Sequence, residues 1–368
     1  MGSRANDASR VALRRRFSRL GSLRLCDCPG VMMSAAQTVS SIESDRGPSD
    51  EGVLRLSAPF TLHHGGVLAD ARLAWRLDGP AGAPVVLAIG GISGHRRVAA
   101  EDRGWWASVA GEGLALDTRR VRVLGIDYLG GSGESTGPVA GTPFPPISAY
   151  DQAAAIAELV QWLRLTPLQA VVGASYGGQV ALALAARSPE VARRWLVLSA
   201  ADRVQPMASA WRSVQREIVR FGIEKGDAAG GLKLARALAM CTYRNPREFA
   251  ARFGGEPRRD CDRFRLPVED YLFSRGDAYV AQYRPESFIC LSQSIDLFRI
   301  DPADVREPVT AMAVREDHLV PLADIERLVA RLPHGRLEIF DSVYGHDAFL
   351  KEPELLRPLF AACLEGTA

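Results

Sequence analysis

Most of this chain after residue 52 consists of short apolar runs separated by longer segments with helical periodicity. Four runs are rich in Val, Leu and Ile and bounded by turn-forming or charged residues, which is typical of buried strands; they are residues 84–89, 121–127, 168–172 and 194–200. Residues 150–165 repeat apolar side chains three and four positions apart, which predicts a helix. Strands that alternate with helices predict an α/β fold with a mostly parallel sheet.

Two segments ahead of these runs alternate apolar and polar residues, the pattern of strands with one buried face. They are residues 53–60 and 67–77, and His63-His64-Gly65-Gly66 forms the turn between them. We therefore expect an antiparallel pair of strands before the parallel part of the sheet.

The alternation of strands and helices stops between residues 204 and 302. Four segments there have helical periodicity, namely residues 211–221, 231–241, 246–253 and 286–298. An interval of this length is too long for a plain loop, so it predicts an all-helical insertion that forms a lid over the site.

The βα pattern resumes after the insertion and continues to the end of the chain. We expect strands at residues 309–314 and 337–340 and helices at residues 322–332 and 346–364. The predicted core therefore comprises residues 51–203 and 303–368, and the predicted lid comprises residues 204–302.

Residues 1–50 differ from the rest in composition. Seven arginines and a single acid, Asp7, lie in its first 24 positions, and a segment rich in Ser, Asp and Gly follows. This pattern fits an organelle transit peptide, a disordered basic tail, or a start codon assigned too early, with Met32 or Met33 as the true start. We favour the early start and expect the extension to be disordered and outside the fold.

The totals place the chain among globular, soluble proteins rather than nucleic-acid or membrane proteins. Apolar residues make up 47% and charged residues 24% of the sequence, and the net charge is only +2. Six cysteines do not form a disulfide framework. No run approaches the ~18 apolar residues of a membrane span. We expect no metal and no resident cofactor.

The stretch Gly173-Ala174-Ser175-Tyr176-Gly177 carries the clearest chemical signal. It matches the G-x-S-x-G pattern of a nucleophile elbow, and it lies between a predicted strand and a predicted helix, as such an elbow requires. The turn is too sharp for bulky flanking residues, and it lifts the serine hydroxyl clear of the sheet. The sequence therefore predicts Ser175 as a nucleophile in an α/β-hydrolase fold.

The order of residues along the chain selects the general base. In this fold the serine is followed by an acid and then by a histidine, which excludes the three histidines that precede Ser175. His334 lies at the wrong edge of the sheet, and His318 directly follows a strand, where the acid is expected. We therefore predict that His346, just past the last strand, accepts the proton of Ser175.

The acid that orients this histidine is expected at the end of the preceding strand. Asp317 occupies that place, with Glu316 and Asp341 as alternatives. The glycine-rich loop at residues 90–95 follows a strand and can supply one oxyanion N–H group. We assign the two oxyanion donors to the backbone amides of Ile92 and Tyr176. A second glycine-rich loop, residues 130–138, has no Lys in Walker spacing, which excludes a P-loop.

Taken together, these motifs resemble the homoserine O-acyltransferase family of the α/β-hydrolase fold, and most of all its branch of homoserine O-succinyltransferases. The resemblance covers nearly everything from about residue 55 to 365. The stretches that carry it are Gly104-Trp105-Trp106 with residues 111–118, residues 130–138 and 173–179, Leu234-Ala235-Arg236 with Thr242-Tyr243-Arg244, and residues 345–350.

The resemblance implies a ping-pong reaction in methionine biosynthesis, in which Ser175 takes an acyl group from acyl-CoA and passes it to the homoserine hydroxyl. By the same resemblance Arg236 binds the homoserine carboxylate and Asp347 binds its amine. Arg244 is the alternative to Arg236. A lid would exclude water from the acyl-enzyme, and acyl-CoA would be a co-substrate rather than a cofactor.

The acyl donor is expected to be succinyl-CoA, with acetyl-CoA as the alternative. Succinyl-specific members carry an arginine two residues after the acid, whereas this chain has Leu319 there, as in acetyl-type members. Arg96 or Arg97 are candidates for the missing cation.

Three other functions fit parts of the pattern: an esterase or thioesterase, acyl transfer to serine, and a non-catalytic binding protein of the same fold. The resemblance also implies a homodimer formed through the lid helices and a cytoplasmic enzyme.

Overall fold

The computed structural model describes residues 50–99 and 103–365. The predictions for residues 1–50 therefore lie outside the described residues, apart from Asp50. Within the described residues no helix is long and apolar enough to cross a membrane.

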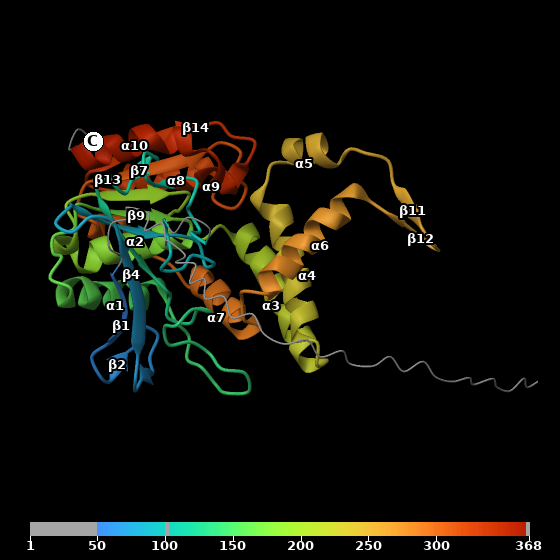
Figure 1. The fold of residues 1–368 in the computed structure, drawn as a ribbon, viewed down its shortest axis with the longest axis horizontal. Helices are drawn as coiled ribbons and strands as arrows, with labels where there is room; N and C mark the ends of the chain where they lie inside the picture. Colours follow the sequence, from blue (N-terminus) through green and yellow to red (C-terminus); the bar gives the residue numbers. More distant parts are fainter. Residues whose placement is uncertain (1–49, 100–102, 366–368) are drawn as a thin grey trace, which may run out of the picture. The chain divides into compact units, whose positions relative to one another are not determined.

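An eight-stranded sheet forms the centre of the fold (Figure 1), in the order β1-β4-β8-β5-β9-β10-β13-β14. The first two strands run antiparallel to their neighbours, and all strands from β8 to β14 run parallel. The strands are Asp50–Arg55 (β1), Arg72–Asp78 (β4), Val85–Ile89 (β5), Arg122–Ile126 (β8), Ala170–Ala174 (β9), Trp195–Leu198 (β10), Val309–Val314 (β13) and Gly335–Phe340 (β14). The α/β prediction with a mostly parallel sheet is confirmed.

Helices cover both faces of this sheet, and the side chains of a central strand alternate between the two layers. In β5, Val85, Leu87 and Ile89 pack toward one core and Val86 and Ala88 toward the other. Helices Ala149–Trp162 (α1), Tyr176–Arg187 (α2) and Leu322–Arg331 (α8) cover the first face. Helix Pro353–Glu365 (α10) covers the second (Figure 1). Because both faces are buried, the central strands are apolar throughout.

The N-terminal antiparallel pair differs in detail from the predicted one. Strands β1 and β4 pair from Asp50–Leu77 to Arg55–Arg72, but the chain between them leaves the sheet. It forms a separate small hairpin of Phe60–Thr61 (β2) and Val67–Leu68 (β3). A second small pair, Ala110–Gly111 (β6) and Leu116–Asp117 (β7), precedes β8.

The insertion between β10 and β13 contains five helices, one more than the sequence predicts. They are Pro206–Glu224 (α3), Ala228–Tyr243 (α4), Pro246–Phe253 (α5), Pro267–Val280 (α6) and Pro285–Asp296 (α7). A short hairpin of Arg258–Asp260 (β11) and Arg263–Arg265 (β12) joins α5 to α6, so the insertion is not helical throughout. Helix α4 packs between α3 and α6, and this arrangement brings α3 and α4 over the end of the sheet (Figure 1).

The C-terminal helix is divided where a single helix is predicted. A 3-10 turn at Gly345–Asp347 (η3) leads into Ala348–Lys351 (α9), and α10 begins at Pro353. Proline disfavours a helical backbone at the residue before it, and Glu352 accordingly has φ −117° and ψ 66°. The break separates the short segment that carries His346 from the long helix that packs on the sheet.

Candidate active site

The strand-to-helix turn around Ser175 has the geometry that its sequence predicts. Strand β9 ends at Ala174 and helix α2 begins at Tyr176, so Ser175 makes the whole turn, with φ 56° and ψ −118°. This region is unfavourable for a residue with a side chain, and such strain is typical of functional positions. A side chain at Gly177 would overlap the carbonyl oxygen of Ile89, and one at Gly173 would overlap that of Gly177. The glycines therefore allow the turn to pack against β5.

The structure brings the three predicted side chains into one hydrogen-bonded chain. His346 Nε2 lies 2.8 Å from Ser175 Oγ, and His346 Nδ1 lies 2.7 Å from Asp317 Oδ2. The other carboxylate oxygen of Asp317 accepts hydrogen bonds from the backbone amides of Leu319 and Val320. These amides fix the carboxylate, and the carboxylate fixes the tautomer of His346 that can accept a proton from Ser175.

Two opposing effects determine the charge state of His346. Its burial alone would lower the pKa, but the charge and hydrogen bond of Asp317, together with the charge of Asp347, outweigh burial and raise the pKa of His346 above its usual value. The nearby carboxylates thus stabilise the protonated form of this imidazole.

The alternative acids and histidines lie elsewhere. Glu316 accepts a hydrogen bond from the backbone of Ser342, and Asp341 is exposed and pairs with Arg315. His318 and His334 are both exposed. Among these candidates only Asp317 contacts His346.

The two amides assigned to an oxyanion site belong to the turn itself and to the loop beside it. A Cβ atom on Gly91 would lie 4.0 Å from that of Ser175, so the loop at residues 90–95 passes directly beside the hydroxyl. Neither the Ile92 nor the Tyr176 amide donates to any of the described residues. The Ile92 carbonyl accepts a hydrogen bond from the hydroxyl of Tyr283, which fixes this loop against the lid. Both amides are therefore free to bind a developing negative charge.

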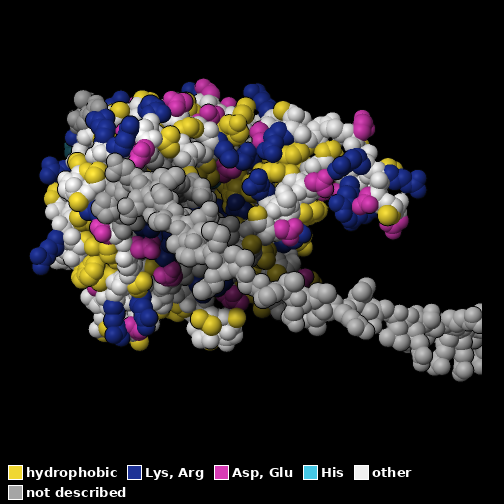
Figure 2. Space-filling model, viewed as in Figure 1, with side chains coloured by type: hydrophobic (Ala, Val, Ile, Leu, Met, Phe, Trp, Pro, Cys, Tyr) yellow, Lys and Arg dark blue, Asp and Glu magenta, His cyan; other side chains and the backbone are white. Residues whose placement is uncertain are grey.

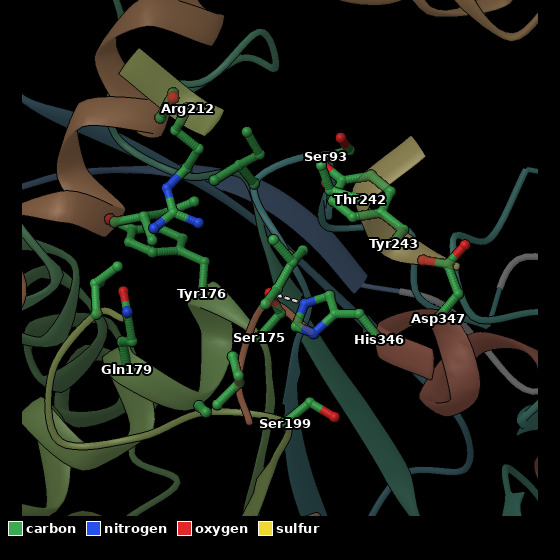
Figure 3. A pocket seen from close by; sticks show the side chains of 18 of the residues that line it. Ser93, Ser175, Tyr176, Gln179, Ser199, Arg212, Thr242, Tyr243, His346 and Asp347 are labelled. Atoms are coloured by element: carbon green, nitrogen blue, oxygen red, sulfur yellow. Dashed lines mark hydrogen bonds between the residues drawn. The ribbon is translucent and has the colours of Figure 1, made fainter. Parts of the chain in front are cut away.

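A cavity of about 180 Å³ opens beside Ser175 Oγ and is roofed by the lid (Figure 3). Helix α3 contributes Trp211, Arg212 and Gln215, and the second half of helix α4 contributes Arg236 and Tyr243. The sheet side contributes the loop at residues 91–94 and the turns after β10 and β13. Core and lid therefore form this site together.

Arg236 and Asp347 line the cavity near His346. The Arg236 guanidinium stacks over the rings of Tyr279 and Tyr243, with its central carbon 4.7 and 5.4 Å from their centroids. The Tyr243 ring lies 6.1 Å from that of His346. Burial disfavours the charge of Arg236, but the tyrosine hydroxyls and Asp347 outweigh it and raise its pKa. No acceptor for the Arg236 N–H groups occurs among the described side chains.

Asp347 is held from its far side by the lid. Arg244 Nε donates to Asp347 Oδ2 at 2.8 Å, and Arg244 Nη1 donates to Glu248 at 3.0 Å. The other oxygen of Asp347 has no donor in the described part of the chain. Arg244 is thus buried in ion pairs and does not line the cavity, unlike Arg236.

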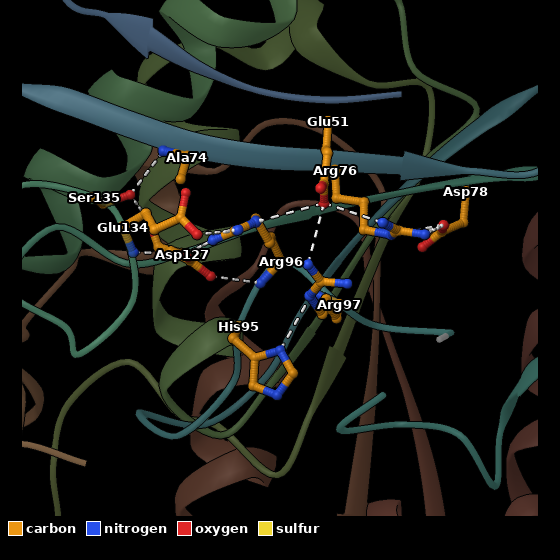
Figure 4. A network of polar contacts seen from close by, with 10 residues as sticks. All are labelled: Glu51, Ala74, Arg76, Asp78, His95, Arg96, Arg97, Asp127, Glu134 and Ser135. Carbon is orange, nitrogen blue, oxygen red and sulfur yellow. Dashed lines mark hydrogen bonds and ion pairs between the residues drawn. The ribbon is translucent and has the colours of Figure 1, made fainter. Parts of the chain in front are cut away.

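Leu319 lines the cavity, whereas the two candidate cations of the sequence analysis do not. Arg96 pairs with Asp127 at 2.5 Å and with Glu134, and Arg97 lies 3.5 Å from Glu51 (Figure 4). This network supports the loop after β5 from outside. The suggestion that Arg96 or Arg97 binds the acyl donor inside the cavity therefore fails, because neither side chain reaches it.

Gln179, Ser199 and Arg212 are among the polar residues of the cavity that the sequence did not predict (Figure 3). Gln179 Oε1 and Ser199 Oγ are buried without a hydrogen-bond partner among the described residues. Gln179 follows Ser175 by one helical turn and so lies on the same face of α2, a signal that was available. Nothing in the local sequence distinguishes Ser199 or Arg212.

A serine on such an elbow, beside a histidine and a buried aspartate, is the arrangement of α/β-hydrolase proteins. The family model for the alpha/beta hydrolase fold matches residues 84–353. The homoserine O-succinyltransferase of Xanthomonas campestris pv. campestris is 39% identical, over 92% of this chain and 93% of that protein. The L-serine/homoserine O-acetyltransferase of Streptomyces lavendulae is 33% identical, over 86% of this chain and 98% of that protein.

A solved structure of homoserine O-acetyltransferase from Bacillus anthracis superposes with a TM-score of 0.76 at 17% identity, covering 86% of this chain and 97% of the other. That likeness concerns the fold. The chain therefore belongs to the α/β-hydrolase family, within the group whose curated members are amino-acid O-acyltransferases. It is an enzyme of this group.

Proposed function

We propose that the protein is a homoserine O-succinyltransferase that works through an acyl-enzyme on Ser175. One observation carries this proposal. Next to Ser175 and His346, a single lidded cavity holds a guanidinium with no acceptor and a carboxylate with one oxygen that has no donor among the described residues. Arg236 and Asp347 present complementary charges to a zwitterionic amino acid. A plain esterase has no need of them.

In the first half-reaction, Ser175 Oγ attacks the thioester carbonyl of acyl-CoA while His346 Nε2 accepts its proton. The Ile92 and Tyr176 amides bind the oxyanion of the tetrahedral intermediate. When the intermediate collapses, the C–S bond breaks and the CoA sulfur takes the proton from His346. Ser175 then carries the acyl group as an ester, and the reaction needs no resident cofactor.

In the second half-reaction, the amino-acid hydroxyl replaces CoA as the nucleophile. The Arg236 guanidinium binds the α-carboxylate of homoserine, and Asp347 binds its ammonium group. His346 accepts the hydroxyl proton, the oxygen attacks the acyl-enzyme, and the proton returns to Ser175 Oγ as the O-acyl product leaves. The lid limits access of water, which would otherwise hydrolyse the ester.

The identity of the relatives supports succinyl over acetyl as the acyl group, since the 39% identical protein is named a homoserine O-succinyltransferase. Leu319 lines the cavity and offers no charge to a succinyl carboxylate, so another cation is needed. A cytoplasmic site of action accords with the use of CoA and an amino acid.

A homodimer formed through the lid is part of the proposal. Helix α3 exposes Met207, Val214 and Phe221, the last with 61% of its surface accessible. Figure 2 shows hydrophobic side chains among Arg and Lys over the arm formed by α5, the hairpin and α6. Apolar side chains that are exposed together on one surface are typical of an interface. Light scattering on the purified protein should give twice the mass of the chain, and a monomer at micromolar concentration would refute the dimer.

The experiment that tests the function is CoA release by protein starting at Met33. Succinyl-CoA and acetyl-CoA are each supplied with L-homoserine, L-serine or no acceptor. We expect release to require homoserine and to be faster with succinyl-CoA. Discrimination against serine should be about 10- to 200-fold, because the acceptors differ by one methylene.

The other outcomes define the alternatives. Release that ignores the acceptor would identify a thioesterase and would contradict the roles of Arg236 and Asp347. Faster release with serine would retain the mechanism and identify serine as the acceptor. One relative is named an L-serine/homoserine O-acetyltransferase, so serine is included in the test.

A further inference from the structure

Three arginines line the cavity, and only one of them is accounted for by the amino-acid acceptor. Arg236 faces Asp347 and Tyr243. Arg203 is half-exposed beside Asp202. Arg212 reaches into the cavity from helix α3, and its side chain is 13% exposed. A nearly buried guanidinium in a reaction cavity needs a negatively charged partner, so the surroundings of Arg212 indicate what it binds.

The carboxylate next to Arg212 is already shared. Asp296 Oδ1 accepts from Arg212 Nε at 2.8 Å and from Ser209 Oγ at 2.9 Å, and Asp296 Oδ2 accepts from Arg216 Nη1 at 2.6 Å. Two guanidinium groups therefore surround one carboxylate, which leaves one positive charge in excess. Because Arg216 is bound to Asp296 and to Ser292 and does not line the cavity, the excess charge is available at Arg212.

The guanidinium of Arg212 keeps one nitrogen free of Asp296. Its Nε and Nη2 atoms both lie against Asp296 Oδ1, at 2.8 and 2.7 Å, and Nη2 is buried. Its Nη1 atom has no acceptor among the described residues. The Nη1–H groups are therefore the donors that a second carboxylate would bind.

Gln179 adds a second polar group to this part of the cavity. It is 7% exposed, and its amide makes no hydrogen bond within the described part of the chain. In Figure 3, Arg212, Gln179 and Tyr176 lie on one side of the Ser175–His346 pair, and Tyr243 and Asp347 lie on the other. The cavity thus has two poles, and the pole opposite the proposed acceptor site is cationic.

We infer that Arg212, assisted by the Gln179 amide, binds the terminal carboxylate of a dicarboxylic acyl group on Ser175 and so selects succinyl over acetyl donors. The inference rests on the proposed function. A succinyl group places its carboxylate two methylenes beyond the reacting carbonyl, on the side away from the acceptor. An acetyl group ends in a methyl and leaves the N–H groups of Arg212 unpaired, which disfavours it.

The test compares three donors: succinyl-CoA, butyryl-CoA as its uncharged equivalent in length, and acetyl-CoA. Arg212→Leu should lower kcat/KM for succinyl-CoA about 10- to 100-fold, the loss expected for contacts to a charged group. The values for butyryl-CoA and acetyl-CoA should stay within about threefold of the original protein. Gln179→Leu should also lower kcat/KM for succinyl-CoA selectively, but by a smaller factor.

Arg220→Leu on the same helix α3 is the matched control, because Arg220 pairs with Glu217 and does not line the cavity. General damage to the lid would affect all three donors and both variants alike. Binding of the donors to protein with Ser175→Ala adds a readout without turnover. In that background, Arg212→Leu should weaken the binding of succinyl-CoA but not that of butyryl-CoA. If Arg212→Leu lowers kcat/KM and binding equally for succinyl-CoA and butyryl-CoA, or lowers neither, the inference is overturned.

The failures can be told apart. If the original protein transfers acetyl but not succinyl groups to homoserine, the acyltransferase stands and the inference about Arg212 falls. If it hydrolyses acyl-CoA without an acceptor, the proposed function falls, and the donor preference of Arg212→Leu still decides the inference. If it releases CoA from no donor and binds none, both fall.

Discussion

At the scale of single residues, the chemistry depends on how charge is placed around His346. Asp317 and Asp347 raise its pKa against the effect of burial, and Asp317 is itself fixed by two backbone amides. A stronger base accepts the Ser175 proton more readily but must first be neutral. In the proposed mechanism, the arrangement that activates the serine therefore also sets a lower pH limit on activity.

The pH dependence of kcat/KM tests this balance. His346 works as a base only when neutral, so activity should fall as pH decreases through a pKa above its usual value of about 6.5. Asp317→Asn removes the main group that raises this pKa and leaves burial, which lowers it. The acidic limb should therefore move to lower pH, and the plateau should fall on the order of 10⁴-fold. A limb that does not move would show that another group controls it.

Arg236 can be tested separately from the first half-reaction. Arg236→Ala should lower kcat/KM for homoserine by about 100-fold or more, since it removes charged contacts to the carboxylate. The initial burst of CoA, which precedes acceptor binding, should be unchanged. Lys233→Ala on the same helix is the control, because Lys233 pairs with Asp277 outside the cavity. Loss of the burst in Arg236→Ala would contradict a role limited to the acceptor.

At the scale of elements, the segment carrying His346 is positioned by its contact with the lid. Gly345 has φ 54°, and a Cβ there would lie 3.0 Å from the Glu316 carbonyl oxygen and 3.1 Å from that of Tyr243. Helix α4 therefore approaches η3 as closely as its backbone allows. Arg244 joins the same two elements through Asp347. Lid and base are thus coupled by packing as well as by charge.

Gly345→Ala should show this coupling. The strained φ and the two close carbonyl contacts should cost about 1–3 kcal/mol of stability and displace His346, so that activity falls more than folding does. Gly141→Ala is the matched control: it also has a positive φ, of 74°, but nothing lies within 4 Å of its Cβ position. Urea denaturation and CoA release measure the two effects. Equal behaviour of both variants would mean that the contact with the lid is unimportant.

At the scale of the whole molecule, apolar runs in the sequence located the parallel strands because these strands are buried on both faces, as Val85–Ile89 illustrates. Helix α6 was missed. It contains Gly276, where a Cβ would lie 2.7 Å from the Lys233 carbonyl oxygen. From the sequence alone, a glycine inside a helical pattern predicts a break in the helix, whereas here it permits close packing between two helices.

The residues of the site also differ in whether the sequence alone predicts them. Ser175, Asp317 and His346 follow from a local motif and from the order of elements along the chain, both of which are visible in the sequence. Arg212 does not, because its significance comes from Asp296, which lies 84 positions away and is already bound by Arg216. Charge left over after tertiary pairing is a property of the folded molecule.

The most direct test of the central claim, acyl transfer through Ser175, is the mass of the intact protein during a half-reaction. Mixed with succinyl-CoA and no acceptor, the protein should gain one succinyl group as it releases one equivalent of CoA. Adding L-homoserine should remove that group and yield O-succinylhomoserine, and protein with Ser175→Ala should gain nothing. Steady release of CoA without any adduct, or an adduct that homoserine does not discharge, would contradict the account.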